Sequence, residues 1–218
     1  MIKLYDFDKL SPREIFARAD DSADVAGAVR DIIDAVRQEG DAALFRFAKQ
    51  FDRADLSALE VTAEELDAAV AGLEPGLAGL LQEAAGRIAA FLRRQLTNSF
   101  VVSEEEGVVL GQKVLPIEKV GLYVPGGTAA YPSSVLMNCI PAKIAGCREI
   151  VMVSPPTGGD ISPVILAAAR IAGVDRVFRT GGAQAVAALA YGTETVPRVD
   201  KIVGPGNAWV AEAKRQVF

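Results

Sequence analysis

The sequence predicts an α/β protein whose second half forms a parallel sheet. One unit recurs four times between residues 119 and 218: a short apolar run, a turn rich in glycine or proline, and a segment with helical periodicity. Because a parallel strand needs a crossover back to its starting edge, usually through a helix, this recurrence favours parallel pairing. The apolar runs and their turns are 120–124 with Pro125-Gly126-Gly127, 150–153 with Ser154-Pro155-Pro156, 177–179 with Thr180-Gly181-Gly182, and 201–203 with Gly204-Pro205-Gly206-Asn207. The crossover helices are expected over residues 133–145, 161–172, 183–190 and 207–217.

The first half has a mostly helical pattern. The tetrapeptides at 11–14 and 62–65 have the form of capping boxes, which predict helices that begin directly after their first residue. The first of these helices is expected to reach about residue 19. Apolar residues at helical spacing predict further helices over 25–39, 44–51 and 77–96. We expect the apolar stripe of the last and longest of them to face the core.

A β-hairpin is predicted between the long helix and the β-α repeats. Two extended runs, residues 100–103 and 108–115, flank the acidic Glu104-Glu105-Glu106-Gly107. Consecutive carboxylates point in different directions, so a solvated hairpin tip is favoured over a metal site.

The change in hydrophobic period predicts two regions. We place a boundary near Lys119, between a helix-rich region of residues 1–118 and a β-α region of residues 119–218. The last helix has no stop signal, and the chain ends on the apolar Phe218. We therefore expect a truncated chain.

Composition excludes several kinds of function. Half of the 218 residues are hydrophobic, which is enough for a sizeable core. The net charge is -5 and no basic run stands out, so nucleic acid and anionic membrane surfaces are not expected as partners. The chain has no histidine, so it cannot offer the familiar zinc sites or a Ser-His nucleophile.

The two cysteines, Cys139 and Cys147, form no CxxC pattern and are interpreted as small buried hydrophobic residues. The chain has neither a leader-like start nor a long apolar span, and we expect a reduced, cytoplasmic protein.

The four turns are the candidate binding site. Right-handed crossovers place them at one edge of the sheet, where helix N-termini present free N–H groups, so we expect an anionic small molecule there. Taken singly, each turn is better explained by ordinary turn glycines, and only the four together at one edge favour a binding site. Trp209 also breaks the GxGxxG pattern that begins at Gly204.

Three side chains at this edge are candidates for ligand contact. Tyr123 ends the first strand, and its alternative role is that of a half-buried aromatic with a hydrated hydroxyl. Gln184 and Asn207 begin crossover helices, where a carboxamide can cap the helix or hydrogen-bond a ribose or amide. Glu194, Asp200 and Lys201 are possible polar site members without a distinctive spacing.

With these motifs the chain resembles the histidinol dehydrogenase family, strongly over residues 119–218 and more loosely before. The resemblance rests on Val120-Gly121-Leu122-Tyr123-Val124-Pro125-Gly126-Gly127, Ile144-Ala145-Gly146-Cys147, Gly181-Gly182-Ala183-Gln184-Ala185 with Tyr191-Gly192-Thr193-Glu194, and Val199-Asp200-Lys201-Ile202-Val203-Gly204-Pro205-Gly206-Asn207 followed by Glu212-Ala213-Lys214-Arg215-Gln216-Val217.

The resemblance implies an aldehyde/histidinol dehydrogenase-like fold. Residues 119–218 would form a Rossmann-like, NAD-contacting domain, and residues 1–118 part of a first α/β domain that later chain completes, so apolar surface or sheet edges should be left uncovered. It further implies a cytoplasmic, homodimeric zinc enzyme of histidine biosynthesis. Such an enzyme uses two NAD in succession to oxidise L-histidinol through histidinal to L-histidine.

Tyr123, Gln184 and Asn207 match the family's NAD contacts. The resemblance places the catalytic Glu-His pair and the zinc ligands beyond residue 218, so no catalytic or metal-binding residue is expected in this chain, and the chain alone is expected to be inactive. Two alternatives stay open: a superfamily relative that oxidises another small alcohol, such as a sulfonated diol, and a non-catalytic NAD-binding or interaction fragment.

Overall fold

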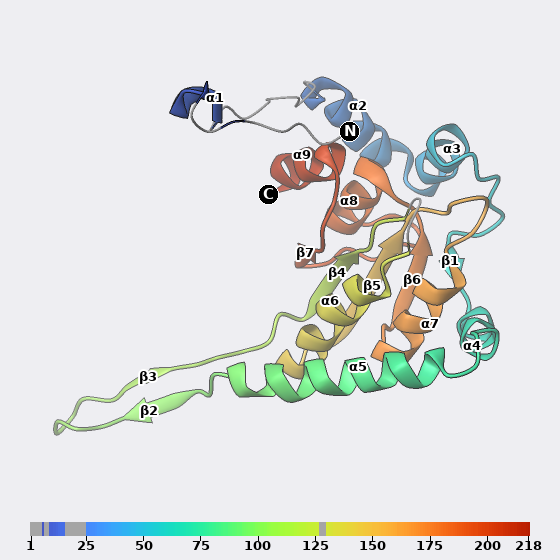
Figure 1. The fold of residues 1–218 in the computed structure, drawn as a ribbon. Coiled ribbons are helices and arrows are strands. Elements are labelled where there is room, and N and C mark those ends of the chain that lie inside the picture. The colour runs from blue at the N-terminus through green and yellow to red at the C-terminus, as the bar shows by residue number, and fades with distance from the viewer. Residues whose placement is uncertain (1–5, 7–8, 16–24, 127–129) are drawn as a thin grey trace.

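A five-stranded sheet with helices on both faces forms the centre of the protein (Figure 1). The computed structural model describes residues 6, 9–15, 25–126 and 130–218. In spatial order the strands are β1 (Glu60–Val61), β6 (Arg176–Arg179), β5 (Glu149–Ser154), β4 (Lys119–Tyr123) and β7 (Lys201–Val203). The strands from β4 to β7 pair in parallel, and β1 pairs antiparallel with β6. The predicted α/β fold with a parallel β-α sheet is therefore confirmed.

The order of the strands reverses beside β4. The chain passes outward from β4 through β5 to β6 and then returns to place β7 on the other side of β4. The helices that make these connections, with the helix after β7, are α6 (Pro132–Ala145), α7 (Pro163–Ala172), α8 (Gly182–Tyr191) and α9 (Ala208–Val217). In open α/β sheets a ligand crevice forms outside the carboxyl ends of the two strands at such a reversal. Here those strands are β4 and β7.

Side-chain alternation along β5 divides the core between the two faces of the sheet. Val151 and Val153 pack in one cluster with residues of α2 (Ala26–Glu39), α3 (Asp41–Phe51), α8 and α9. Ile150 and Met152 pack in another with residues of α4 (Ala63–Ala71), α6 and α7. All four side chains are fully buried, as expected for a strand covered on both faces.

The predicted N-terminal helices are present. They are α1 (Pro12–Ile15), α2 (Ala26–Glu39), α3 (Asp41–Phe51), α4 (Ala63–Ala71) and α5 (Leu77–Leu92), the last followed by a 3-10 turn, η2 (Arg93–Gln95). The capping box before α4 is complete, because Glu65 N–H donates to Thr62 Oγ1 at 3.2 Å and Thr62 N–H donates to Glu65 Oε2 at 2.8 Å. Residues 16–19, expected to extend α1, lie outside the described residues.

The expectation that the whole apolar stripe of α5 faces the core is wrong. Leu81 is buried, and Ala84, Ile88 and Leu92 pack against a small cluster beneath α6. Leu80 and Phe91, by contrast, are 63% and 66% exposed. The reason is that α5 lies as an outer layer across α6 and α7, which cover only one side of it (Figure 1).

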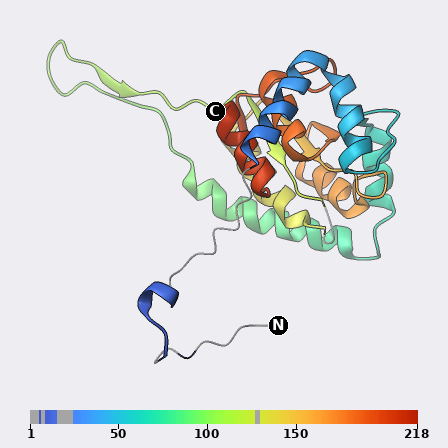
Figure 2. The ribbon, with the colours of Figure 1, turned by 90° about the horizontal axis from the view of Figure 1, so that it is seen from above.

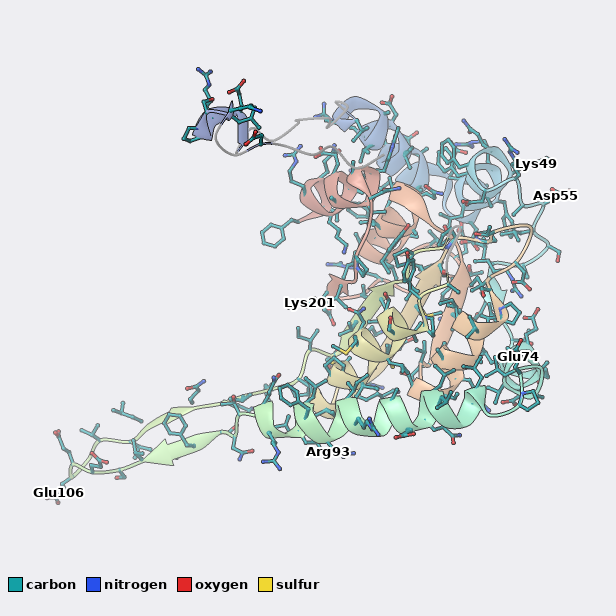
Figure 3. The ribbon with its side chains drawn as sticks, in the orientation of Figure 1. Lys49, Asp55, Glu74, Arg93, Glu106 and Lys201 are labelled. Carbon is teal, nitrogen blue, oxygen red and sulfur yellow. The ribbon has the colours of Figure 1, made fainter. Side chains whose placement is uncertain are left out.

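The predicted hairpin is confirmed and projects from the body as an arm (Figures 1 and 2). Its strands are β2 (Phe100–Val102) and β3 (Leu110–Gln112), paired antiparallel. Its acidic tip is exposed, and Glu106 lies at the far end of the arm (Figure 3). Apolar side chains on both strands are exposed as well, among them Val101 and Leu110. This protein therefore carries uncovered apolar surface, as the family resemblance led us to expect.

The predicted boundary near Lys119 stays a prediction. The described residues on either side of it share one sheet, because β1 from the first region pairs with β6 from the second. Helices α2 and α3 also pack on α8 within a single hydrophobic cluster.

Candidate functional site

A pocket of about 520 Å³ opens where the strand order reverses. Its lining comes from the end of β4 and the turn after it, the turn after β5, the N-terminal turns of α8 and α9, the middle of α2 and the C-terminal end of α3. The sequence motifs at 125–126 and 204–207 thus reach one site, although they are far apart along the chain. Gly127 lies outside the described residues.

All three predicted contact residues, Tyr123, Gln184 and Asn207, line this pocket. They come from the end of β4, the first turn of α8 and the residue that precedes α9. The structure therefore brings together side chains that sequence reasoning selected from three separate repeats.

Tyr123 is buried, with 4% of its surface exposed, and its hydroxyl oxygen accepts a hydrogen bond from Gly182 N–H at 3.0 Å. The hydroxyl proton remains available to a ligand. Burial raises the pKa of Tyr123, the Gly182 N–H opposes this, and the nearby negative charge of Asp52 adds to the increase. Tyr123 is thus a neutral hydrogen-bond donor at physiological pH.

Gln184 is 2% exposed and packs against Gly182. Gly182 has φ +64°, and a Cβ there would lie 2.6 Å from Gln184 Oε1, so both the backbone and the carboxamide require glycine at this position. The N-cap residue of α8 is Gly181, and no side-chain hydrogen bond caps this helix. The Gln184 carboxamide is therefore not a helix cap.

Asn207 does cap its helix, because its Oδ1 accepts from Val210 N–H at 3.1 Å. Its side-chain amide can still donate. The turn before it approaches β4 closely: Gly204 has φ +111°, and a side chain there would overlap the carbonyl oxygen of Tyr123.

Sequence reasoning missed four further pocket residues, Ile32, Phe51, Asp52 and Trp209. Phe51 and Trp209 are large aromatics with 49% and 38% of their surface exposed. Asp52 follows α3 as its C-cap residue. The one local signal that could have identified Asp52 is its position, because an acidic residue is unfavourable at a helix C-terminus, where the helix dipole is negative.

Asp52 has an unusual environment. Its Oδ2 is buried and has no hydrogen-bond partner among the described residues. Burial raises the pKa of Asp52 from 3.8 to about 6.

The remaining polar candidates have structural roles. Glu194 accepts from Asp41 N–H at 2.7 Å and so caps the start of α3, while Asp200 accepts from Lys119 N–H at 2.9 Å. Lys201 is exposed on the edge strand β7. None of the three lines the pocket in the described part of the chain.

Cys139 is buried as predicted, and burial raises the pKa of its thiol to about 12. Cys147 is only half-buried, just beyond the end of α6. Its thiol pKa is raised by the same cause.

Within the ranges that the structure describes, no three potential metal ligands come together. The chain also has no histidine, so the described residues do not fit a zinc ion. None of the described helices combines the length and the apolarity that a bilayer crossing demands.

The reversed strand order and the pocket beside it define an α/β protein of the doubly wound class with a pocket at the switch point. More specifically, the chain belongs to the histidinol dehydrogenase family, whose model matches residues 16–218.

Similar proteins agree with this assignment. Histidinol dehydrogenase of Syntrophotalea carbinolica is 59% identical over 196 residues, which is 89% of this chain and 46% of that protein. The enzyme of Agrobacterium fabrum is 53% identical over 215 residues, 98% of this chain and 50% of its own length. The crystal structure of histidinol dehydrogenase from Elizabethkingia anophelis superposes with a TM-score of 0.86 at 38% identity, covering 89% of this chain and 45% of that one. The chain thus spans about half the length of the curated relatives it matches.

Proposed function

We propose that this chain forms the NAD-binding part of a histidinol dehydrogenase, which oxidises L-histidinol through histidinal to L-histidine. One observation carries the proposal: Tyr123, Gln184 and Asn207 line one pocket at the switch point of a doubly wound sheet. The pocket volume, about 520 Å³, lies within the range typical of small-molecule sites. Membership of the family supports the identity of the reaction.

The pocket residues fit a dinucleotide. The N-terminal turns of α8 and α9 both line the pocket, and helix N-termini favour anionic groups such as a pyrophosphate. The exposed faces of Phe51 and Trp209 offer flat apolar surfaces for the ring systems. Tyr123, Gln184 and Asn207 supply hydrogen bonds that orient the cofactor. When bound, NAD supplies the hydride acceptor for the oxidation.

The proposal includes zinc dependence, a homodimer and a cytoplasmic location only because the resemblance to the family implies them. The described residues do not fit zinc, and we derive no step through it. Because the chain contains no histidine, we propose that it does not complete the oxidation alone.

Calorimetric titration with NAD tests the proposal. Tyr123→Phe removes the hydroxyl that bonds Gly182 and faces the pocket, and it is expected to weaken NAD binding about three- to tenfold. The matched control is Tyr191→Phe, at the opposite end of α8 and outside the pocket lining, which should leave the dissociation constant unchanged.

The titration separates two failures. Absence of NAD binding to the wild-type chain would remove the NAD-binding role. Equal affinity of the wild type and the Tyr123→Phe variant would show that NAD binds elsewhere. Histidinol oxidation measured with the purified 218-residue chain should give no NADH above a no-enzyme control, and sustained turnover would refute the proposed inactivity.

A further inference from the structure

Asp52 is the pocket residue that the proposed contacts leave unexplained. It is held in place by the way α3 ends: Asp52 N–H and Ala54 N–H both donate to Ala48 O at 3.1 Å, and Arg53 between them adopts a left-handed conformation with φ +54°. Arg53 thus occupies the left-handed position directly after the helix end, where glycine is usual. The backbone therefore fixes Asp52 at the pocket at the expense of local strain.

Within the described part of the chain, no donor reaches the buried oxygen of the Asp52 carboxylate. Other acidic residues near this region are paired: Glu39 with Arg46 on the outer side of α3, and Asp55 with Lys49. For Asp52, no described residue donates to the buried Oδ2. A desolvated carboxylate without a donor destabilises a fold, and a ligand that donates hydrogen bonds to its other oxygen offsets part of this cost.

The charge distribution of the pocket restricts which part of a ligand can meet Asp52. Among the described lining residues, Asp52 is the only one with a charged side chain. It stands at the negative C-terminal end of α3, whereas α8 and α9 present their positive N-terminal ends. The pocket is therefore complementary to a ligand with an anionic centre near α8 and α9 and hydrogen-bond donors beside α3.

A dinucleotide has this pattern, because its pyrophosphate is flanked by riboses that each carry two neighbouring hydroxyls. One carboxylate can accept from both hydroxyls of a ribose, as acidic residues do in other doubly wound folds. The buried Oδ2 does not prevent this, because Oδ1 is not among the buried atoms without a partner and a single carboxylate oxygen can accept two hydrogen bonds.

We propose that Asp52 selects the cofactor: its carboxylate accepts hydrogen bonds from the hydroxyls of the adenosine ribose and excludes a ribose that bears a 2′-phosphate. The inference rests on the proposed NAD-binding role of the pocket. It assigns Asp52, a residue of the N-terminal region, to the NAD site and predicts that the site prefers NAD over NADP. A 2′-phosphate would place negative charge against a carboxylate that no described cation offsets.

Titration with NAD and with NADP tests the inference in the wild type, Asp52→Asn and Asp52→Ala. The wild type should bind NAD at least tenfold more tightly than NADP. Asp52→Asn should weaken NAD binding about tenfold and reduce the preference to threefold or less, and Asp52→Ala should do the same. The control is Asp55→Asn, which removes an exposed carboxylate in the loop after α3, beside Lys49 (Figure 3), and should change neither affinity.

Each outcome has one consequence. If the wild type binds NAD but the variants keep its preference, or lose NAD and NADP affinity equally, the selecting role of Asp52 is refuted while the NAD site stands. If the wild type does not bind NAD, the proposed function falls together with this inference. Thermal unfolding of each variant establishes that it is folded, and the isosteric Asp52→Asn is expected to be at least as stable as the wild type.

Discussion

Asp52 should reduce the stability of the folded chain above pH 6, and removing its charge should restore that stability. The carboxyl has a pKa of 3.8 in the unfolded chain and about 6 when folded, because burial disfavours the charged form. The folded state therefore binds the proton more tightly than the unfolded state. The contribution of Asp52 to stability is fully present below pH 3.8 and is lost as the pH rises through about 6.

The size of this effect follows from the shift. Roughly two pH units correspond to about 3 kcal/mol for a carboxyl shut off from water. Asp52 lines an open pocket, so solvent screening reduces this to about 1 kcal/mol. Asp52→Asn should thus raise the free energy of unfolding by about 1 kcal/mol at pH 8, or the midpoint temperature by about 2–4 °C, and the gain should shrink toward zero at pH 4.

Urea denaturation of the two proteins from pH 4 to pH 8 measures this difference. Asp55→Asn is the matched control, because its exposed carboxylate pairs only with Lys49, and it should change stability by less than about 0.5 kcal/mol at every pH. An Asp52→Asn variant that is less stable than the wild type at pH 8, or a gain that does not depend on pH, would refute the reasoning.

Three further substitutions test the local geometry of the site. Gly182→Ala should cost about 1–2 kcal/mol of stability, since φ is +64° and the new Cβ meets the Gln184 carboxamide. Its control is Gly86→Ala in the exposed interior of α5, which should stabilise by up to about 1 kcal/mol, and equal effects of the two in denaturation would contradict this. Asn207→Ala should lower the free energy of unfolding by about 1 kcal/mol, because the helix cap is lost, and should also weaken NAD binding. Asn207→Asp keeps the cap, so comparing the two variants by denaturation and by NAD titration separates the binding effect from the stability effect. Arg53→Gly should stabilise by about 0.5 kcal/mol by relieving the left-handed strain, and a loss in thermal unfolding would count against it.

Much of the fold was predictable because its signals are local. The glycine and proline turns after β4 and β6, the capping box at Thr62 and the glycine stops of α6 and α7 are all set by neighbouring residues. Right-handed crossovers then place Tyr123, Gln184 and Asn207 at one edge of the sheet. Their convergence could therefore be inferred without coordinates.

The missed features depend on tertiary contacts instead. Strand β1 has only two residues and forms by pairing with β6. A strand this short has no hydrophobic periodicity from which it could be predicted. Phe51 and Asp52 reach the pocket because α3 packs beside α8, a contact that no short-range pattern encodes. The exposure of Leu80 and Phe91 likewise depends on how little of α5 its neighbours cover.

A crystal structure of this chain with NAD tests the proposed site most directly. The pyrophosphate should lie against the N-terminal turns of α8 and α9, with Tyr123, Gln184 and Asn207 in contact with the dinucleotide and the adenosine ribose beside Asp52. NAD bound at another surface, or with its pyrophosphate next to Asp52 and away from both helix N-termini, would contradict it.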